Sequence, residues 1–167
     1  MPSGTSRDWR IIAIDPGPVE SAWICYEANT GIPLAWRKAP NAQVLAEVPD
    51  LPVDQLAIEM IASYGMAVGA EVFETCVWIG RFIQGWAEVT GAEPLRILRR
   101  DVKLHLCGSA RAKDPNVRQA LIDRWGGKEA AIGRKASPGP LYGVSGDVWA
   151  ALAVAVCVAD TRLEAAA

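Results

Sequence analysis

The chain has 167 residues, a length within the usual range for one domain, so we expect a single domain over residues 1–167. Its 51% hydrophobic and 22% charged residues are typical of a globular protein, and no apolar run approaches the roughly 18 residues that would span a membrane. The formal net charge of −2 excludes a uniformly basic protein but leaves room for a local basic surface.

The N-terminal part of the chain predicts three antiparallel strands. The first ten residues are polar and lack the apolar core of a signal peptide, which predicts a cytoplasmic protein. Residues 9–15 form an apolar run that ends in Asp15 before a Pro-Gly pair, as a buried strand running into a turn would. Residues 21–28 and 32–37 are two further short runs, separated by a turn sequence that is typical of a hairpin.

The middle of the chain predicts a buried strand between two helices. A short helix is expected over residues 41–47, followed by a buried strand over residues 55–60 with Glu59 near its end. Apolar side chains then recur at helical spacing over residues 70–90, which predicts a long helix closed by Gly91.

The pattern continues with strand and helix in alternation. Residues 94–98 predict a fifth strand, residues 101–106 a short helix, and residues 114–125 a helix with a proline at its first position. The segment 126–143 is rich in Gly, Pro, Lys and Arg and is expected to be a mobile loop.

The last predicted element is an apolar helix that Ser145 is expected to N-cap and that runs to about Arg162. Asp147 would then lie in its first turn. No internal repeat is present, so the order of elements predicts one mixed α/β domain.

Charges are segregated along the chain. Residues 96–135 carry 11 Lys and Arg against 4 Asp and Glu, whereas residues 1–95 carry 5 against 12. Phosphate binding draws much of its affinity from Lys and Arg, so the basic segment is compatible with a nucleic-acid partner. The alternative is that these charges gather by chance on solvated helix faces.

Three carboxylates stand at the ends of predicted elements, namely Asp15, Glu59 and Asp147. Each has apolar neighbours, among which a lone ionised carboxylate is costly to bury, so a compensating cation is expected. Oxygen ligands suit Mg²⁺ or Mn²⁺, and two such ions can clamp a phosphodiester. Separate explanations remain open, because Asp15 could cap its turn, Glu59 could pair with an arginine, and Asp147 could favour the helix N-terminus.

Three stretches of the sequence resemble the RuvC family of Holliday-junction resolvases, within the ribonuclease H-like superfamily. They are IIAIDPGPVESAW, the strand LAIEM followed by a long helix, and GDVWAALAVAV, and together they cover nearly the whole chain. The family's first strand ends in Asp-x-Gly, a later strand ends in Ile-Glu, and the last helix opens with Asp. Asp15, Glu59 and Asp147 occupy those three positions and, by this resemblance, are the expected catalytic and metal-binding residues.

The resemblance implies a fold, an activity and partners. The fold would be ribonuclease H-like, with a five-stranded mixed sheet flanked by helices. The activity would be that of a crossover junction endodeoxyribonuclease, a hydrolase that cuts four-way or other branched DNA with two Mg²⁺ or Mn²⁺ ions and leaves 5′ phosphate and 3′ hydroxyl ends. The protein would be a homodimer that presents two equivalent sites to the junction. The sequence assigns no helicase partner.

The basic segment supplies the expected DNA contacts. Val102-Lys103, Gly108, Ala112 and Val117 resemble the family's segment that links the fifth strand to the DNA-facing helix. By this resemblance Lys103, Arg111 and Lys113 are candidate phosphate contacts. Arg100 and Arg118 lie in the same segment and complete the expected DNA-binding set.

One position departs from the family's pattern. The family usually places a fourth acid or a histidine three residues before the final aspartate, where this chain has Val144. Three carboxylates could suffice, another residue could fill the gap, or metal affinity could be reduced. Two alternatives therefore stand beside the resolvase, namely a nuclease of the same superfamily with another nucleic-acid substrate and a catalytically silent protein that binds branched DNA.

Other residues have simpler interpretations. His105 is expected to be structural, although phosphate contact or general-base catalysis is the alternative. Trp149 is expected to be a core residue, and the alternative is that it is a stacking platform for bases. The four cysteines lie far apart with no CxxC pair, which predicts buried reduced thiols instead of a zinc site.

Overall fold

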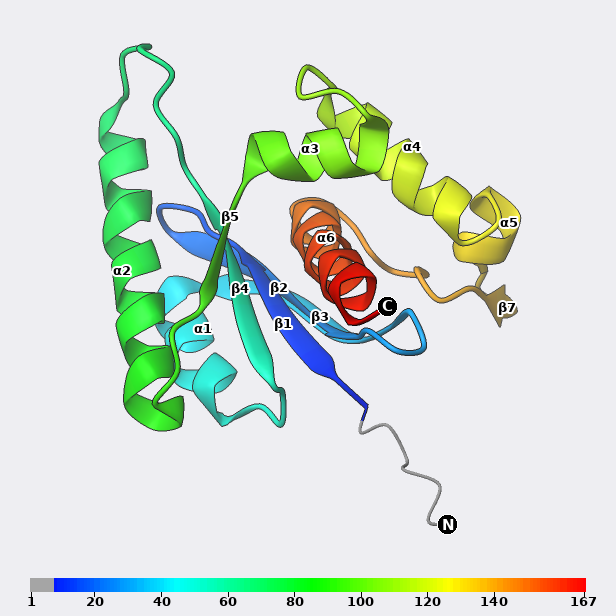
Figure 1. Ribbon diagram of the computed structural model, residues 1–167, viewed down its shortest axis with the longest axis horizontal. Coiled ribbons are helices and arrows are strands. Elements are labelled where there is room, and N and C mark those ends of the chain that lie inside the picture. Colours follow the sequence, from blue (N-terminus) through cyan, green and yellow to red (C-terminus); the bar gives the residue numbers. More distant parts are fainter. Residues whose placement is uncertain (1–7) are drawn as a thin grey trace.

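The computed structural model describes residues 8–167, so residues 1–7, on which part of the signal-peptide argument rests, lie outside the described residues. Figure 1 shows three layers, with helices on both sides of a central sheet. No helix in the described part of the chain is long and apolar enough to cross a membrane.

The central sheet is mixed and has five strands in the order β3-β2-β1-β4-β5. The strands are β1 (Arg10–Asp15), β2 (Glu20–Glu27), β3 (Ile32–Pro40), β4 (Gln55–Met60) and β5 (Leu95–Leu98). The first three pair antiparallel, whereas β4 pairs parallel with both β1 and β5. The five strands that the sequence predicts are therefore confirmed, as is the expected mixed α/β class.

Helices cover the two faces of the sheet (Figure 1). One face carries α1 (Asn41–Glu47), the 3-10 turn η1 (Val48–Asp50) and the long α2 (Ala70–Thr90). The other carries α3 (Arg99–Cys107), α4 (Asp114–Arg124) and α6 (Val148–Ala166). The short α5 (Lys128–Ala131) and a small hairpin of β6 (Gly133–Arg134) and β7 (Ser137–Pro138) follow α4.

Alternation along β1 divides the core into two clusters. Ile11 and Ala13 face the cluster of α3, α4 and α6, whereas Ile12 and Ile14 face the cluster of α1 and α2. Because successive side chains of a strand point to opposite faces, a strand covered on both sides must be apolar throughout. Helix α6 is buried nearly all round from Val148 to Ala159, which explains its almost unbroken apolar sequence.

Two expectations for the C-terminal third are wrong. The segment 126–143 is not an irregular loop, because α5 and the β6–β7 hairpin occupy much of it. Gly139 packs so closely that an added Cβ would lie 2.4 Å from the carbonyl oxygens of Ala130 and Ala131. The N-cap of α6 is Asp147 instead of Ser145, and the helix runs past Arg162 to Ala166. The Ser145 carbonyl accepts a backbone bond from Val148 at 3.1 Å, within the turn that precedes the helix.

Candidate active site

Asp15 and Glu59 meet at one edge and on one face of the sheet. Strands β1 and β4 run parallel with Ile14 opposite Ile58, so the next residue of each strand is the acid. Ile14 and Ile58 both pack against α1 and α2. Because side chains alternate, the two acids point to the opposite face, where α3, α4 and α6 lie.

The turn after β1 is held by a buried polar network. A Cβ on Gly17 would lie 2.4 Å from the Glu20 carbonyl oxygen, so only glycine fits this close turn. The Gly17 N–H donates to Ser21 Oγ at 3.2 Å, and Ser21 donates to Asn41 Oδ1 at 2.6 Å. Asn41 in turn donates to the Gly17 carbonyl at 2.9 Å. These bonds hold the backbone that places Asp15 at the end of the strand.

Asp147 comes from the other end of the chain. It is the residue directly before α6, and its carboxylate makes no capping bond to the helix. Instead the carboxylate pairs with Lys38 Nζ of β3 at 2.7 Å. The predicted location of Asp147 at the start of the last helix is confirmed to within one residue. Its ion pair with Lys38 was not predicted.

An open cavity of about 140 Å³ brings the three predicted acids together. Asp15, Glu59 and Asp147 all line it, and so does a fourth acid, Asp114 at the start of α4. Val144 does not, because its side chain is only 7% exposed and packs in the core beside α6. The site therefore has four carboxylates, with the fourth supplied from a different element than the family's pattern suggests.

Arg99 joins two of these acids across the cavity. Its Nη1 lies 3.1 Å from Glu59 Oε1, and its Nη2 lies 2.9 Å from Asp114 Oδ1. Lys103 Nζ also lies 3.7 Å from Asp114. Neither Arg99 nor Asp114 was among the predicted catalytic residues. The available signal was positional, since Arg99 directly follows β5 and Asp114 opens α4 before a proline.

Burial makes the inner acids difficult to ionise. Burial, followed by the charge of Glu59, raises the pKa of Asp15 to about 7, against the opposing effect of Arg99. Burial also raises the pKa of Glu59, although Arg99 acts in the opposite direction. At the cavity mouth, the hydrogen bond from Arg99 lowers the pKa of Asp114. Arg99 therefore offsets only part of the effect of burial on the pKa values of Asp15 and Glu59.

The donor chemistry of the cavity fits a hard divalent cation. All four acids offer oxygen atoms, which Mg²⁺ and Mn²⁺ prefer, and a cation would favour the ionised form of Asp15 that burial makes costly. Within residues 8–167, no three His, Cys, Asp or Glu side chains are already arranged as a metal-binding group. Two of the acids have basic partners instead, since Glu59 pairs with Arg99 and Asp147 pairs with Lys38.

The five predicted DNA contacts divide into three groups. Lys103 and Arg118 line the cavity, and the Arg118 guanidinium lies 4.9 Å from the centre of the Trp149 ring. Arg100 lines an adjoining groove with Glu59 and Lys103. Arg111 and Lys113 are exposed in and beside the α3–α4 connection, outside the cavity wall.

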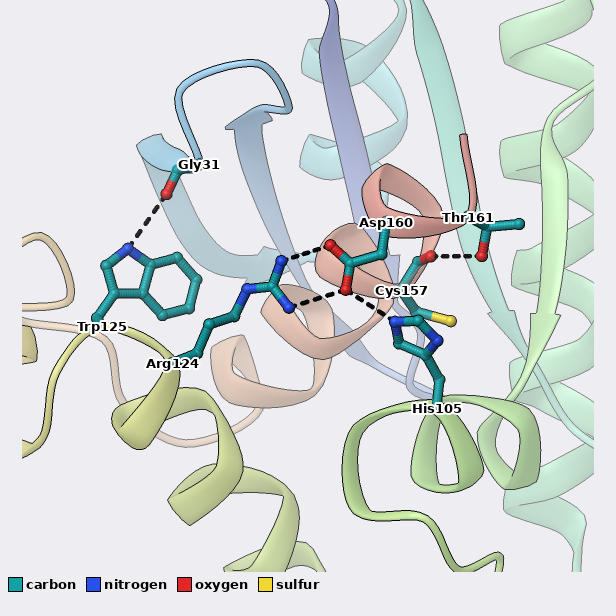
Figure 2. Close-up of polar contacts among 7 residues, drawn as sticks. All are labelled: Gly31, His105, Arg124, Trp125, Cys157, Asp160 and Thr161. Carbon is teal, nitrogen blue, oxygen red and sulfur yellow. Dashed lines mark hydrogen bonds and ion pairs between the residues drawn. The ribbon is translucent and has the colours of Figure 1, made fainter. Parts of the chain in front are cut away.

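His105 does not line the cavity and belongs to another polar cluster, which Figure 2 shows. Its Nε2 lies 2.8 Å from Asp160 Oδ2, and Arg124 binds both oxygens of the same carboxylate. The three residues come from α3, α6 and α4 respectively. Asp160 therefore ties the two helices that carry Lys103 and Asp114 to α6, which agrees with the structural interpretation of His105.

The remaining aromatic and thiol predictions have mixed outcomes. Trp149 is 7% exposed, which confirms that it belongs to the core. All four cysteines are free thiols, as expected. Cys157 is buried, and burial raises its pKa to about 11. Cys76 is exposed, so the expectation that all four are buried is wrong.

Comparison with known proteins identifies the fold. No protein-family model and no curated protein matches the sequence. The solved structure of Thermus thermophilus RuvC superposes with a TM-score of 0.65 at 16% identity, covering 93% of this chain and 96% of that chain. T. thermophilus RuvC in complex with Holliday junction substrate gives a TM-score of 0.62 at 16% identity, with the same coverage. The chain therefore has a RuvC-like fold, of the ribonuclease H-like type that the sequence resemblance predicts.

Proposed function

We propose that the protein is a structure-selective endonuclease that cleaves four-way or other branched DNA by metal-assisted hydrolysis of a phosphodiester bond. The observation that carries this proposal is the meeting of Asp15, Glu59 and Asp147 in one cavity whose wall also holds Lys103 and Arg118. Acids that bind cations and basic side chains that bind phosphate are the two components that such chemistry requires. The RuvC-like fold and the junction bound to one of the similar structures support this choice of substrate.

The chain's own residues have distinct tasks in this proposal. Asp15, Glu59 and Asp147 would hold the divalent ions, Mg²⁺ or Mn²⁺, with two per site expected. When bound, such ions activate water for attack and stabilise charge at the phosphate. Lys103 and Arg118 would hold the phosphate against the acids, while Arg100, Arg111 and Lys113 would contact the DNA backbone further out. The buried ring of Trp149 packs against the Arg118 guanidinium and so would help to orient it.

The test is cleavage of a labelled four-way junction in Mg²⁺ and in Mn²⁺, beside linear duplex and RNA–DNA hybrid. Wild type is expected to nick the junction, and Asp15→Asn and Glu59→Gln are each expected to slow cleavage by about a hundredfold or more, because each loses a ligand charge. The matched control is Asp50→Asn, an exposed acid of η1 on the opposite face of the sheet, which is expected to cut like wild type.

Two outcomes would select the alternatives. Preferential cutting of the RNA–DNA hybrid would identify a ribonuclease H-like enzyme with another substrate. Tight junction binding with no cleavage in either metal would identify a silent branched-DNA-binding protein, for which the valine at position 144 would then be the natural explanation.

We also propose that the protein acts as a homodimer formed through α2. Phe73 and Val77 lie one helical turn apart and are 63% and 55% exposed, and the preceding segment exposes Tyr64 and Met66. Neighbouring exposed apolar side chains such as Phe73 and Val77 are typical of interaction surfaces. A second copy would cover them and would supply the second site that paired cuts need.

The double substitution Phe73→Glu and Val77→Glu is expected to convert the dimer to a monomer, because charges are costly in an apolar interface. Size-exclusion chromatography with light scattering measures the mass. Leu163→Glu, an equally severe change at an exposed site of α6, is the control and is expected to leave the mass unchanged. A monomeric wild type at micromolar concentration would contradict the proposal.

A further inference from the structure

We propose that Arg99 is a built-in counter-ion of the metal site, which competes with the divalent cation for Glu59 and transfers to the DNA phosphate once the cation binds. This inference rests on the proposed function, because it assumes that Glu59 is a metal ligand. It assigns a role to a residue that lies outside the predicted set of ligands and DNA contacts.

The geometry shows an inner and an outer bond. Glu59 is an inner partner, since its side chain is 11% exposed, whereas Asp114 at the cavity mouth is 69% exposed. Arg99 spans the two with separate nitrogen atoms, at 3.1 Å to Glu59 and 2.9 Å to Asp114. Loss of the inner bond would therefore leave the guanidinium held by Asp114 and still within the cavity.

A guanidinium and a divalent cation cannot share Glu59 without cost. Arg99 Nη1 lies 3.1 Å from Glu59 Oε1, so a cation bound to either oxygen of this carboxylate would place two like charges within a few ångströms. The positive charge that stabilises the free protein therefore weakens its affinity for metal. Removal of the arginine should strengthen metal binding, the opposite of what a ligand or a purely supportive residue would do.

The cavity wall supplies the destination of the released side chain. Arg99 lines the cavity together with Lys103 and Arg118, at the place proposed for the phosphate. The planar guanidinium can donate two parallel hydrogen bonds to phosphate oxygens. Metal binding would then free a phosphate ligand, and phosphate binding would remove a competitor of the metal, so each ligand is expected to tighten the other.

The experiment measures Mn²⁺ affinity by isothermal titration calorimetry without DNA. Arg99→Ala is expected to bind Mn²⁺ about tenfold more tightly than wild type. Arg99→Lys keeps the charge, but its single amino group cannot bridge both acids as the guanidinium does. Its Mn²⁺ affinity should therefore lie between those of wild type and Arg99→Ala. Arg96→Ala removes the same charge from the exposed surface of neighbouring β5, away from the cavity, and is expected to match wild type. Junction binding in saturating Ca²⁺, followed by fluorescence anisotropy, should be weaker in Arg99→Ala than in Arg96→Ala.

The possible failures are distinguishable. Unchanged or weaker Mn²⁺ binding by Arg99→Ala, with clear binding by wild type and none by Asp15→Asn, would overturn the counter-ion role alone. Absence of Mn²⁺ binding in wild type and in Arg99→Ala alike would overturn the metal-dependent function itself. Binding by Arg99→Ala but not by wild type would support the proposal in its strongest form.

Discussion

Asp15→Asn is expected to stabilise the metal-free protein at pH 8, by at most about 4 kcal/mol. Burial and the neighbouring acids raise the pKa of Asp15 from 3.8 in its ordinary state to about 7. Folding therefore favours the neutral carboxyl. The stability that the neutral carboxyl contributes is fully present below pH 3.8 and is lost as the pH rises through 7. Above pH 7 the folded chain must hold an unfavourable charge at Asp15. Asparagine carries no charge at any of these pH values.

Urea unfolding at several pH values measures this effect. The variant should exceed wild type in free energy of unfolding at pH 8, and the difference should shrink to near zero at pH 4. Addition of Mn²⁺ should reverse the order, since the metal favours the ionised Asp15 of wild type. A variant that is less stable than wild type at pH 8 without metal would show that Asp15 has a favourable partner in the folded chain.

Asp160→Ala is expected to lower the free energy of unfolding by about 2–3 kcal/mol, or the melting temperature by about 5–10 °C. The Asp160 side chain is 14% exposed and accepts bonds from His105 of α3 and Arg124 of α4 (Figure 2). Its removal leaves both donors without this acceptor. The Arg124 contact contributes the smaller share, because that side chain is 42% exposed and solvent screens it.

Differential scanning calorimetry tests this expectation, and Glu164→Ala serves as the matched control because it removes an exposed acid four residues further along α6. The control should change the melting temperature by about 1 °C or less. Junction binding by Asp160→Ala should also weaken, since α3 and α4 carry Lys103 and Arg118. Equal melting temperatures for the two variants would show that Asp160 does not anchor these helices.

The sequence was informative where one local pattern decides the structure. Asp15 and Glu59 could be placed at strand ends because each closes an apolar run, and Gly91 could be placed after α2 because a left-handed residue ends many helices. The segment 126–143 was predicted incorrectly because its Gly, Pro and Lys content resembles a loop. In the structure Gly133 and Gly139 permit close backbone packing instead.

Side-chain partners were not predictable in the same way. Arg99 pairs with an acid 40 residues earlier and another 15 residues later, and Lys38 pairs with Asp147 from the opposite part of the chain. No periodicity encodes such pairs, since they depend on how β3, α3 and α4 are brought around α6. The prediction that Ser145 caps the last helix was wrong for a related reason. Ser145 lies in the turn that precedes the helix, and the helix begins only at Val148, where the chain enters the core.

The position of α6 has a consequence for how the protein is made. This helix is the last element of the chain described, yet its residues 148–159 fill the middle of one core cluster and its first neighbour, Asp147, completes the cavity. A growing chain would therefore hold a sheet whose α3–α4 face lacks the middle of its apolar core until these residues leave the ribosome. Folding must await contacts between distant segments, which is slow. The nuclease chemistry proposed here would require Asp147 and α6 to have been made, so a chain terminated before Asp147 would be an inactive and aggregation-prone fragment instead of an unregulated enzyme that cuts DNA.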